Sequence, residues 1–179
     1  YVTGWAKSSN FPTNNGAYKD SLGGSWDAFL TKFTSSGSLR WSTYLGGGSD
    51  DRGKDLTTDG SENIYITGKA RSGFPTTKGT YQNSFGGGNN DAFISKFSST
   101  GSLSWSTYLG GSNDESGSGL TTDSIGNIYV TGSAESGFPT TNGAFQSSFG
   151  GGDDDAFISK LNNDGSLSWS TYLGGANGE

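Results

Sequence analysis

The amino-acid sequence predicts an all-β protein made of three tandem repeats. Three observations support this prediction: a period of 64 residues, apolar residues that alternate with polar ones in short segments, and glycine-rich stretches between the segments. The segment Gly101–Gly111 reads GSLSWSTYLGG and recurs unchanged at Gly165–Gly175. It recurs again at Gly37–Gly47, where Arg40 is its single change. A fixed period of this length indicates one structural unit per repeat.

Each repeat is expected to contain four short strands that pair as two hairpins. In the third repeat, strand A is LTTD at Leu120–Asp123 and strand B is IYVTG at Ile128–Gly132. Strand C is DAFISKL at Asp155–Leu161 and strand D is SLSWSTYL at Ser166–Leu173. β-Branched and aromatic residues that alternate around Gly/Asn turns are typical of hairpins. Because no segment has a helical period, we expect strands throughout.

Four-stranded units in tandem predict β-propeller blades. Both faces of each sheet carry apolar side chains, since Phe93 and Ile94 point in opposite directions, so each sheet needs neighbours on both sides. We expect blade 1 at residues 1–51, blade 2 at residues 52–115 and blade 3 at residues 116–179. Blade 1 lacks strand A, and its open edge invites pairing with another chain. We therefore expect self-association, either as a ring of two chains or end to end.

The repeated motifs resemble the SBBP repeat of bacterial proteins, a family named for a seven-bladed β-propeller. The motifs that carry the resemblance are YVTG, FPTT-x-GAFQ, DAFISK, SLSWSTYLGG and GNIYVTG, and they cover essentially the whole chain. The resemblance implies a propeller-forming repeat in large secreted or surface proteins of bacteria, and it implies no catalytic residues. Seven blades need far more chain than this. The first repeat also departs from the others, with Ser25-Trp26-Asp27 where they have NND or DDD.

Composition excludes several classes of function. The chain has no Cys, no His and no Met, which excludes a disulfide framework and removes the commonest general base and metal ligand. The net charge of −6 disfavours nucleic acid, whose phosphates need Lys and Arg. No apolar run approaches the length of about 18 residues that a membrane helix needs, so we expect no membrane insertion. An acidic, Cys-free, Gly/Ser-rich composition fits an extracellular or bacterial cell-surface protein.

The long loops between strands B and C, and between D and A, are expected at one end of each blade. They hold the unusual sequence, and sites tend to lie on loops of a rigid scaffold. The candidate ligand-binding residues are Trp5, Trp26, Asn89, Asn90, Asp91, Asp153, Asp154 and Asp155. The candidate calcium ligands, chosen because Ca²⁺ takes carboxylate and amide oxygens, are Asp50, Asp51, Asp114 and Glu115. The alternative interpretation is that Gly, Asn and Asp form turns there. No cofactor other than calcium is expected.

Three further repeated features are expected to be structural. Phe-Pro pairs should pin the long loop to the blade, tryptophans of strand D should lie in the core, and lysines of strand C should pair with a repeated Asp. These features are Phe11-Pro12, Phe74-Pro75 and Phe138-Pro139, then Trp41, Trp105 and Trp169, then Lys32, Lys96 and Lys160.

The function expected first is that of a non-enzymatic extracellular module, which serves as a scaffold or as an adhesion or protein-interaction surface. The second is a carbohydrate-binding propeller with one site per blade, assisted by calcium. A polysaccharide hydrolase or lyase comes third, because a Ser nucleophile would lack a His base and no carboxylate pair stands out from the repeat. The expected partner is a further copy of the chain, another protein or a glycan.

Overall fold

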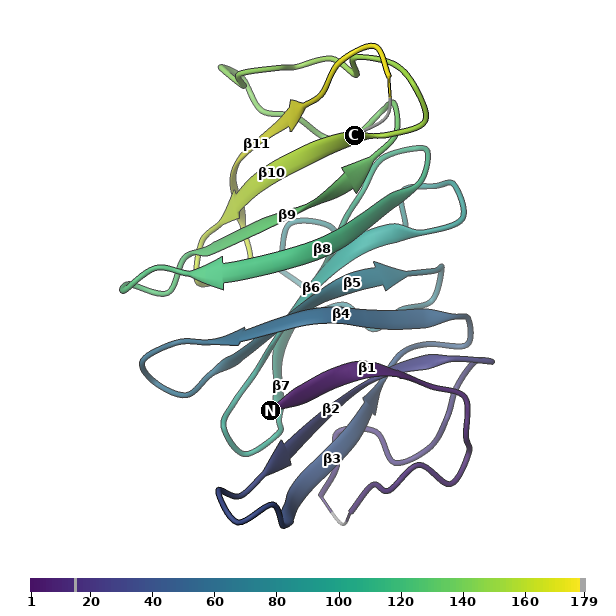
Figure 1. The fold of residues 1–179 in the computed structure, drawn as a ribbon, viewed down its shortest axis with the longest axis vertical. Helices are drawn as coiled ribbons and strands as arrows, with labels where there is room; N and C mark the ends of the chain where they lie inside the picture. Colours follow the sequence, from purple (N-terminus) through teal and green to yellow (C-terminus); the bar gives the residue numbers. More distant parts are fainter. Residues whose placement is uncertain (15, 178–179) are drawn as a thin grey trace.

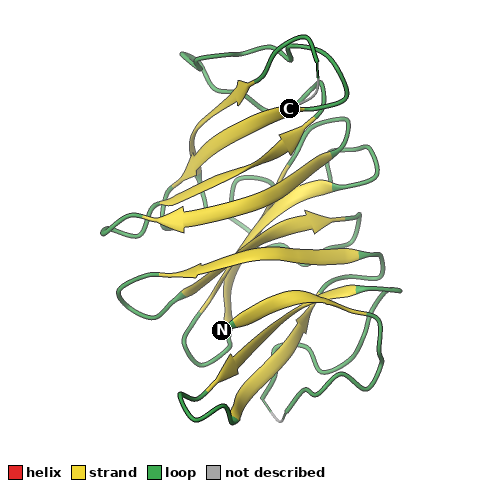
Figure 2. Cartoon of the chain, viewed as in Figure 1, coloured by secondary structure: helices red, strands yellow, loops and turns green. Residues whose placement is uncertain are grey.

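The computed structural model describes residues 1–14 and 16–177, and over these residues it consists of three antiparallel sheets without helices (Figures 1 and 2). The first sheet contains β1 (Val2–Ala6), β2 (Asp27–Phe33) and β3 (Leu39–Leu45). The second contains β4 (Asp51–Thr58), β5 (Ile64–Ala70), β6 (Asp91–Phe97) and β7 (Leu103–Leu109). The third contains β8 (Glu115–Thr122), β9 (Ile128–Ala134), β10 (Asp155–Leu161) and β11 (Leu167–Leu173). The prediction of all-β, propeller-like repeats, the first without its A strand, is confirmed.

The A strands are longer than the sequence suggests. The expected strand of the third repeat begins at Leu120, whereas β8 begins at Glu115. In the second sheet, β4 begins at Asp51 and carries a β-bulge at Lys54, between Gly53 and Asp55. Gly53 lies against the first sheet, where an added Cβ would come within 2.3 Å of Thr3 Oγ1. Close packing against the first sheet thus requires glycine inside a strand. Because glycine is rare in strands, the sequence of this segment resembles that of a loop.

The sheets stack face to face along the long axis of the molecule, so that the core lies between them (Figure 1). We call the contact between the first and second sheets the first seam, and the contact between the second and third sheets the second seam. The first seam buries Ala28, Leu30 and Leu45 against Ile66 and Phe93. The second seam repeats this packing with the equivalent residues 64 positions later. Burial of each leucine, isoleucine or phenylalanine among them contributes about 1.5–3 kcal/mol, so neighbouring sheets stabilise one another.

A tryptophan of strand D fastens each sheet to the next. Trp41 Nε1 donates to the carbonyl of Ser99 at 3.1 Å, and Trp105 Nε1 donates to that of Asn163 at 2.9 Å. The indole of Trp41 covers Gly101, which has φ +89° and where an added Cβ would lie 3.0 Å from the ring. The prediction that these tryptophans are core residues is confirmed for Trp105, whereas Trp169 is exposed because no sheet covers it in the described structure.

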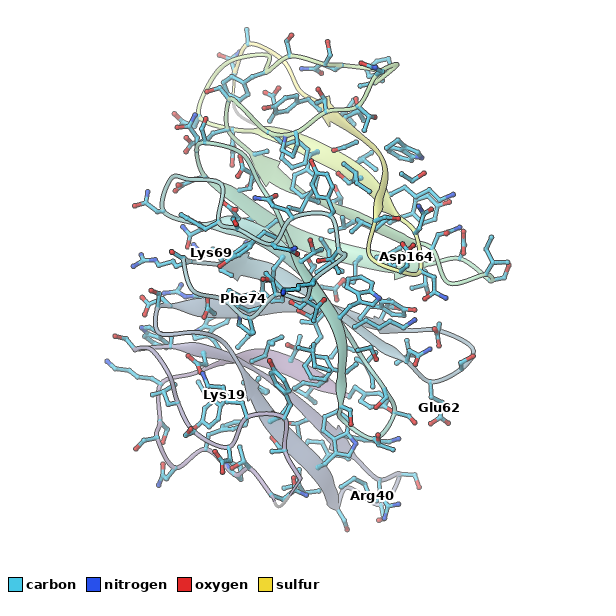
Figure 3. All side chains as sticks on the ribbon, turned by 180° about the vertical axis from the view of Figure 1, so that it is seen from behind. Lys19, Arg40, Glu62, Lys69, Phe74 and Asp164 are labelled. Atoms are coloured by element: carbon cyan, nitrogen blue, oxygen red, sulfur yellow. The ribbon has the colours of Figure 1, made fainter. Side chains whose placement is uncertain are left out.

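The two ends of each sheet differ in character. Glu62 and Asp164, in the short turns, lie at one side of the molecule in Figure 3, and Lys19 and Lys69 lie at the opposite side, with the long loops. Phe74 pins one long loop, since its ring lies 4.4 Å from that of Phe93 and its N–H donates to the Tyr108 hydroxyl at 2.9 Å. The structural role predicted for the Phe-Pro pairs is confirmed there.

Candidate functional site

A pair of buried carboxyl groups lies at the loop end of each seam. Asp27 and Asp51 form the pair at the first seam, and Asp91 and Glu115 form it at the second. A Cβ added to Gly110 would lie 2.4 Å from Cγ of Asp91 and 2.6 Å from Oε2 of Glu115. Glycine at this position therefore lets the two carboxyl groups approach the same point of the backbone.

At the first seam, every oxygen of the pair accepts a hydrogen bond. Asp27 accepts from the N–H groups of Gly23 and Gly24, at 3.0 and 3.1 Å, and from Lys19 Nζ at 2.6 Å. Asp51 accepts from the N–H of Gly47 at 2.7 Å and, through its other oxygen, from that of Arg71 at 3.0 Å. The ammonium group of Lys19 thus supplies a positive charge beside two buried acids.

At the second seam, a glutamine and a glutamate change this arrangement. Gln82 replaces the lysine and donates to Asp91 Oδ2 at 3.2 Å, while Glu115 Oε2 accepts from the N–H of Gly111 at 2.8 Å. Asp91 Oδ1 and Glu115 Oε1 have no hydrogen-bond partner within residues 1–14 and 16–177. The N–H of Glu135, equivalent to that of Arg71, donates instead to the carbonyl of Asp114 at 3.0 Å.

Burial raises the pKa values of Asp51, Asp91 and Glu115 because it disfavours the charged form. It raises the pKa of Asp51 to about 7, that of Asp91 to about 6 and that of Glu115 to about 8. Backbone N–H groups act in the opposite direction on all three, and Lys19 also lowers the pKa of Asp51. Glu115 therefore keeps its proton in most molecules at neutral pH.

The first seam also carries a stack of aromatic rings and cations. The guanidinium of Arg52 lies 5.6 Å from the ring centre of Trp5 and 5.4 Å from that of Trp26, and Lys7 Nζ lies 5.5 Å from the Trp26 ring. The structure thus brings the two predicted tryptophans together, Trp5 on β1 and Trp26 just before β2. Sequence reasoning missed Arg52 between them. The sequence does mark Arg52 as unusual, because the equivalent position in the next repeat holds a serine, Ser116.

The same place at the second seam holds polar side chains and a cavity. Lys69, Asn90 and Ser116 stand where the first seam has Trp5, Trp26 and Arg52. A cavity of about 300 Å³ is lined there by these residues together with Lys54, Asp114, Glu115, Ser133, Glu135, Asp153 and Asp154. Four of the predicted ligand-binding and metal-binding acids, and Asn90, therefore meet at one cavity.

The remaining predicted site residues hold the loops in place. Asn89 donates to Asp114 through its side chain at 3.1 Å, and Asp155, the equivalent of Asp91, accepts from Gln146 at 3.1 Å. Asp50 lies 3.9 Å from Arg71. The four predicted calcium ligands are divided between the two seams, and the described residues contain no group of three or more acids that could hold a metal ion. Calcium binding stays a prediction.

The predicted pairing of the repeated lysines with a repeated Asp is present only as a longer-range attraction: the charge of Asp59 opposes the lowering of the Lys96 pKa, and Lys160 lowers the pKa of Asp123. Lys32, Lys96 and Lys160 lie over tyrosine rings of strand B, at 5.1, 5.2 and 5.4 Å from the ring centres of Tyr1, Tyr65 and Tyr129. Register explains this, since Lys96 faces Tyr65 and Lys160 faces Tyr129 directly across the sheet. A lysine on an aromatic ring gains a cation–π interaction, and the ammonium groups of Lys32 and Lys96 also have polar partners, Glu62 and Asn163.

Comparison with known proteins agrees with this geometry. The family model of the SBBP beta-propeller repeat matches residues 40–75 and 104–139. Each matched segment runs from strand D of one sheet into the long loop of the next, and so crosses one seam. A comparison with curated proteins found no match. The described part of the chain has no helix long and apolar enough to cross a membrane. Over these two segments the chain is therefore similar to SBBP beta-propeller repeats.

Proposed function

We propose that this chain is a non-enzymatic, extracellular scaffold module, placed at a bacterial cell surface or secreted, whose outer faces bind further blades of its own kind. The main support for the proposal is that both outer faces expose apolar residues whose equivalents in the neighbouring repeat are buried at a seam. Trp169 is 38% exposed, whereas its equivalent Trp105 is 8% exposed. Phe33 is 45% exposed, whereas its equivalent Phe97 is fully buried.

The two outer faces are complementary in the way that neighbouring sheets inside the chain are. The face of the third sheet presents Trp169 and Leu173, equivalent to residues that face the next sheet at each seam. The face of the first sheet presents Val2, Phe33 and Leu39 around an apolar cavity of about 300 Å³. A second copy placed on the third sheet would offer the Ser35 carbonyl to Trp169, because Ser35 is the equivalent of Ser99 and Asn163. Exposed apolar patches of this kind mark interaction surfaces.

The open edge of β1 adds a second contact of the same type. The first sheet has the order β1–β2–β3, so β1 has a paired strand on one side only in the described structure. Unpaired strand edges offer N–H and C=O groups to another chain. Face stacking and edge pairing both lead to a ring of two chains or to longer end-to-end assemblies.

Light scattering at increasing concentration tests this proposal. We expect the average mass to rise with concentration for the unaltered chain, and Trp169→Ala to move that rise to at least about tenfold higher concentration. The matched control is Ile125→Ser, which removes an exposed apolar side chain from the turn between β8 and β9. A monomer at every concentration, or an equal effect of both variants, would count against the proposal.

Carbohydrate binding is a second candidate, favoured by one observation. The Trp5 ring is 46% exposed beside Trp26, and exposed indoles stack on sugar rings. The equivalent positions in the other sheets are Lys69 and Ser133, so such a platform exists at one seam and not once per blade. A glycan array screened with and without calcium, with Trp5→Ala as the comparison, decides this candidate. Binding that survives Trp5→Ala would place the sugar elsewhere.

A further inference from the structure

The cavity at the second seam has walls of opposite charge. Lys54 and Lys69 line it from β4 and β5 of the second sheet, while Glu115, Glu135 and Asp154 line it from the third. Within residues 1–14 and 16–177, neither lysine forms an ion pair, and neither do Glu135 and Asp154. Lysines and acids thus face one another across the cavity without an ion pair among the described residues.

The bulge in β4 contributes to this arrangement. Lys54 is the bulged residue, and bulges re-aim a side chain out of the regular alternation. Desolvation lowers the pKa of Lys54, and the neighbouring charges of Lys69 and Arg52 lower it further. Asp114, which also lines the cavity, is the acid whose pKa the charge of Lys69 lowers, and two like charges side by side still favour a further anionic group between them. The lysine wall thus fits a carboxylate.

The opposite wall holds buried polar atoms without hydrogen-bond partners among the described residues. Glu115 is 1% exposed, and its Oε1 has no hydrogen-bond partner among the described residues. The hydroxyl of Ser116, which also lines the cavity, has none either. At the first seam the equivalent Asp51 has both oxygens satisfied, and Arg52 fills the place of Ser116 with a cation. In the free chain burial favours the protonated form of Glu115, whereas an ammonium group held beside it would favour the carboxylate, which could then accept from that group.

We propose that this cavity binds a small zwitterion of the amino-acid type, with its carboxylate between Lys54 and Lys69 and its ammonium group donating to Glu115 and Ser116. A simple anion would leave the acids without donors, and a simple cation would leave two lysines unpaired. A ligand with both charges satisfies both walls. Its ammonium group takes the place that the first seam gives to the side chain of Arg52.

Titration of the whole chain with L-alanine, followed by NMR chemical shifts, tests the proposal. Propionate and propylamine each carry one of the two charges, and D-glucuronate represents an acidic sugar. We expect saturable binding of alanine at least about tenfold tighter than that of any of the other three probes, because each of them leaves one wall unpaired. Absence of saturable alanine binding, or equal binding of another probe, would overturn the proposal.

Two variants and one control locate the site. Glu115→Gln is nearly isosteric, and Lys69→Ser introduces the residue that the third sheet has at the equivalent position, Ser133. We expect each to weaken alanine binding at least about tenfold, while circular dichroism reports an unchanged fold. The control, Lys78→Ser, removes an exposed lysine of the neighbouring long loop that does not line the cavity. Equal loss in the control, or full binding by Glu115→Gln, would refute the assignment.

Discussion

The first and second seams share one backbone geometry and differ in the side chains that surround an equivalent pair of buried acids. The first seam supplies Lys19 to Asp27, satisfies both oxygens of Asp51 and covers the place with Trp5, Arg52 and Trp26. The second seam supplies the neutral Gln82 and leaves a cavity of about 300 Å³.

Comparison of the two seams shows which residues every repeat keeps in order to stack and which residues differ between repeats. The apolar faces, the strand D tryptophan and the paired acids recur at both seams. Two changes convert the closed first seam into the open second one. Gln82 takes the place of Lys19, and Lys69, Ser116 and Asn90 take the places of Trp5, Arg52 and Trp26. Chemistry specific to one blade can thus be built without altering the fold.

The largest expected effect compares three equivalent tryptophans. Trp105→Ala should cost about 3–5 kcal/mol of unfolding free energy, because it empties a buried site at the second seam. Trp41→Ala, at the less buried position of the first seam, should cost less, and Trp169→Ala should cost under about 1 kcal/mol. Urea unfolding followed by circular dichroism measures all three. Equal costs would show that burial at the seams does not set stability.

Exchange of the two residues that face the acid pairs should alter stability in opposite directions. Lys19→Gln removes the cation beside Asp27, which is fully buried, and should cost about 2 kcal/mol at pH 8. Gln82→Lys brings a cation to Asp91 and Glu115 and should stabilise the second seam at the same pH. Urea midpoints at pH 8 measure both. A stability gain in Lys19→Gln would contradict this account of the first seam.

Stability should fall as the pH rises from about 4.5 to about 8. The pKa of Glu115 is raised from 4.5 to about 8 on folding, so the folded state binds more protons in this window and loses stability through it. The pKa values of Asp51 and Asp91 act in the same direction, up to about 7 and about 6.

Glu115→Gln should therefore flatten the pH profile and raise stability at pH 8, on the order of 1–3 kcal/mol. Thermal melts between pH 4 and pH 9 measure the effect. The exposed Glu62→Gln serves as control and should leave the slope unchanged. A stability that rises with pH in the unaltered chain would show that Glu115 is ionised in the fold.

The smallest expected effect comes from opening the first seam. Arg52→Ser introduces the residue of the second seam and removes two cation–π contacts, at a cost of about 1 kcal/mol. Trp5 and Trp26 should become more accessible to a fluorescence quencher. Arg40→Ser is the matched control, because it replaces an exposed arginine by the serine of the other repeats. Unchanged quenching in Arg52→Ser would show that the stack does not hold these rings.

Much of the architecture could be predicted from the repeat. Period, alternation and turn residues located the B, C and D strands to within a few residues, since these signals are local. The first halves of β4 and β8 were missed, because their glycines serve contacts with a neighbouring sheet. The tyrosine rings beneath the strand C lysines were missed, because facing residues depend on the register between strands.

The sequence by itself determined that this protein consists of stacked antiparallel sheets, the first without its A strand, because the alternation of apolar and polar residues recurs with the period of the repeat. It also indicated the loop end as the place for a site. Only the tertiary structure decided that Asp91 meets Glu115 and that Lys54 and Lys69 face the acids of the next sheet. These pairs join different sheets, and their meeting depends on how the sheets stack, which no local pattern encodes.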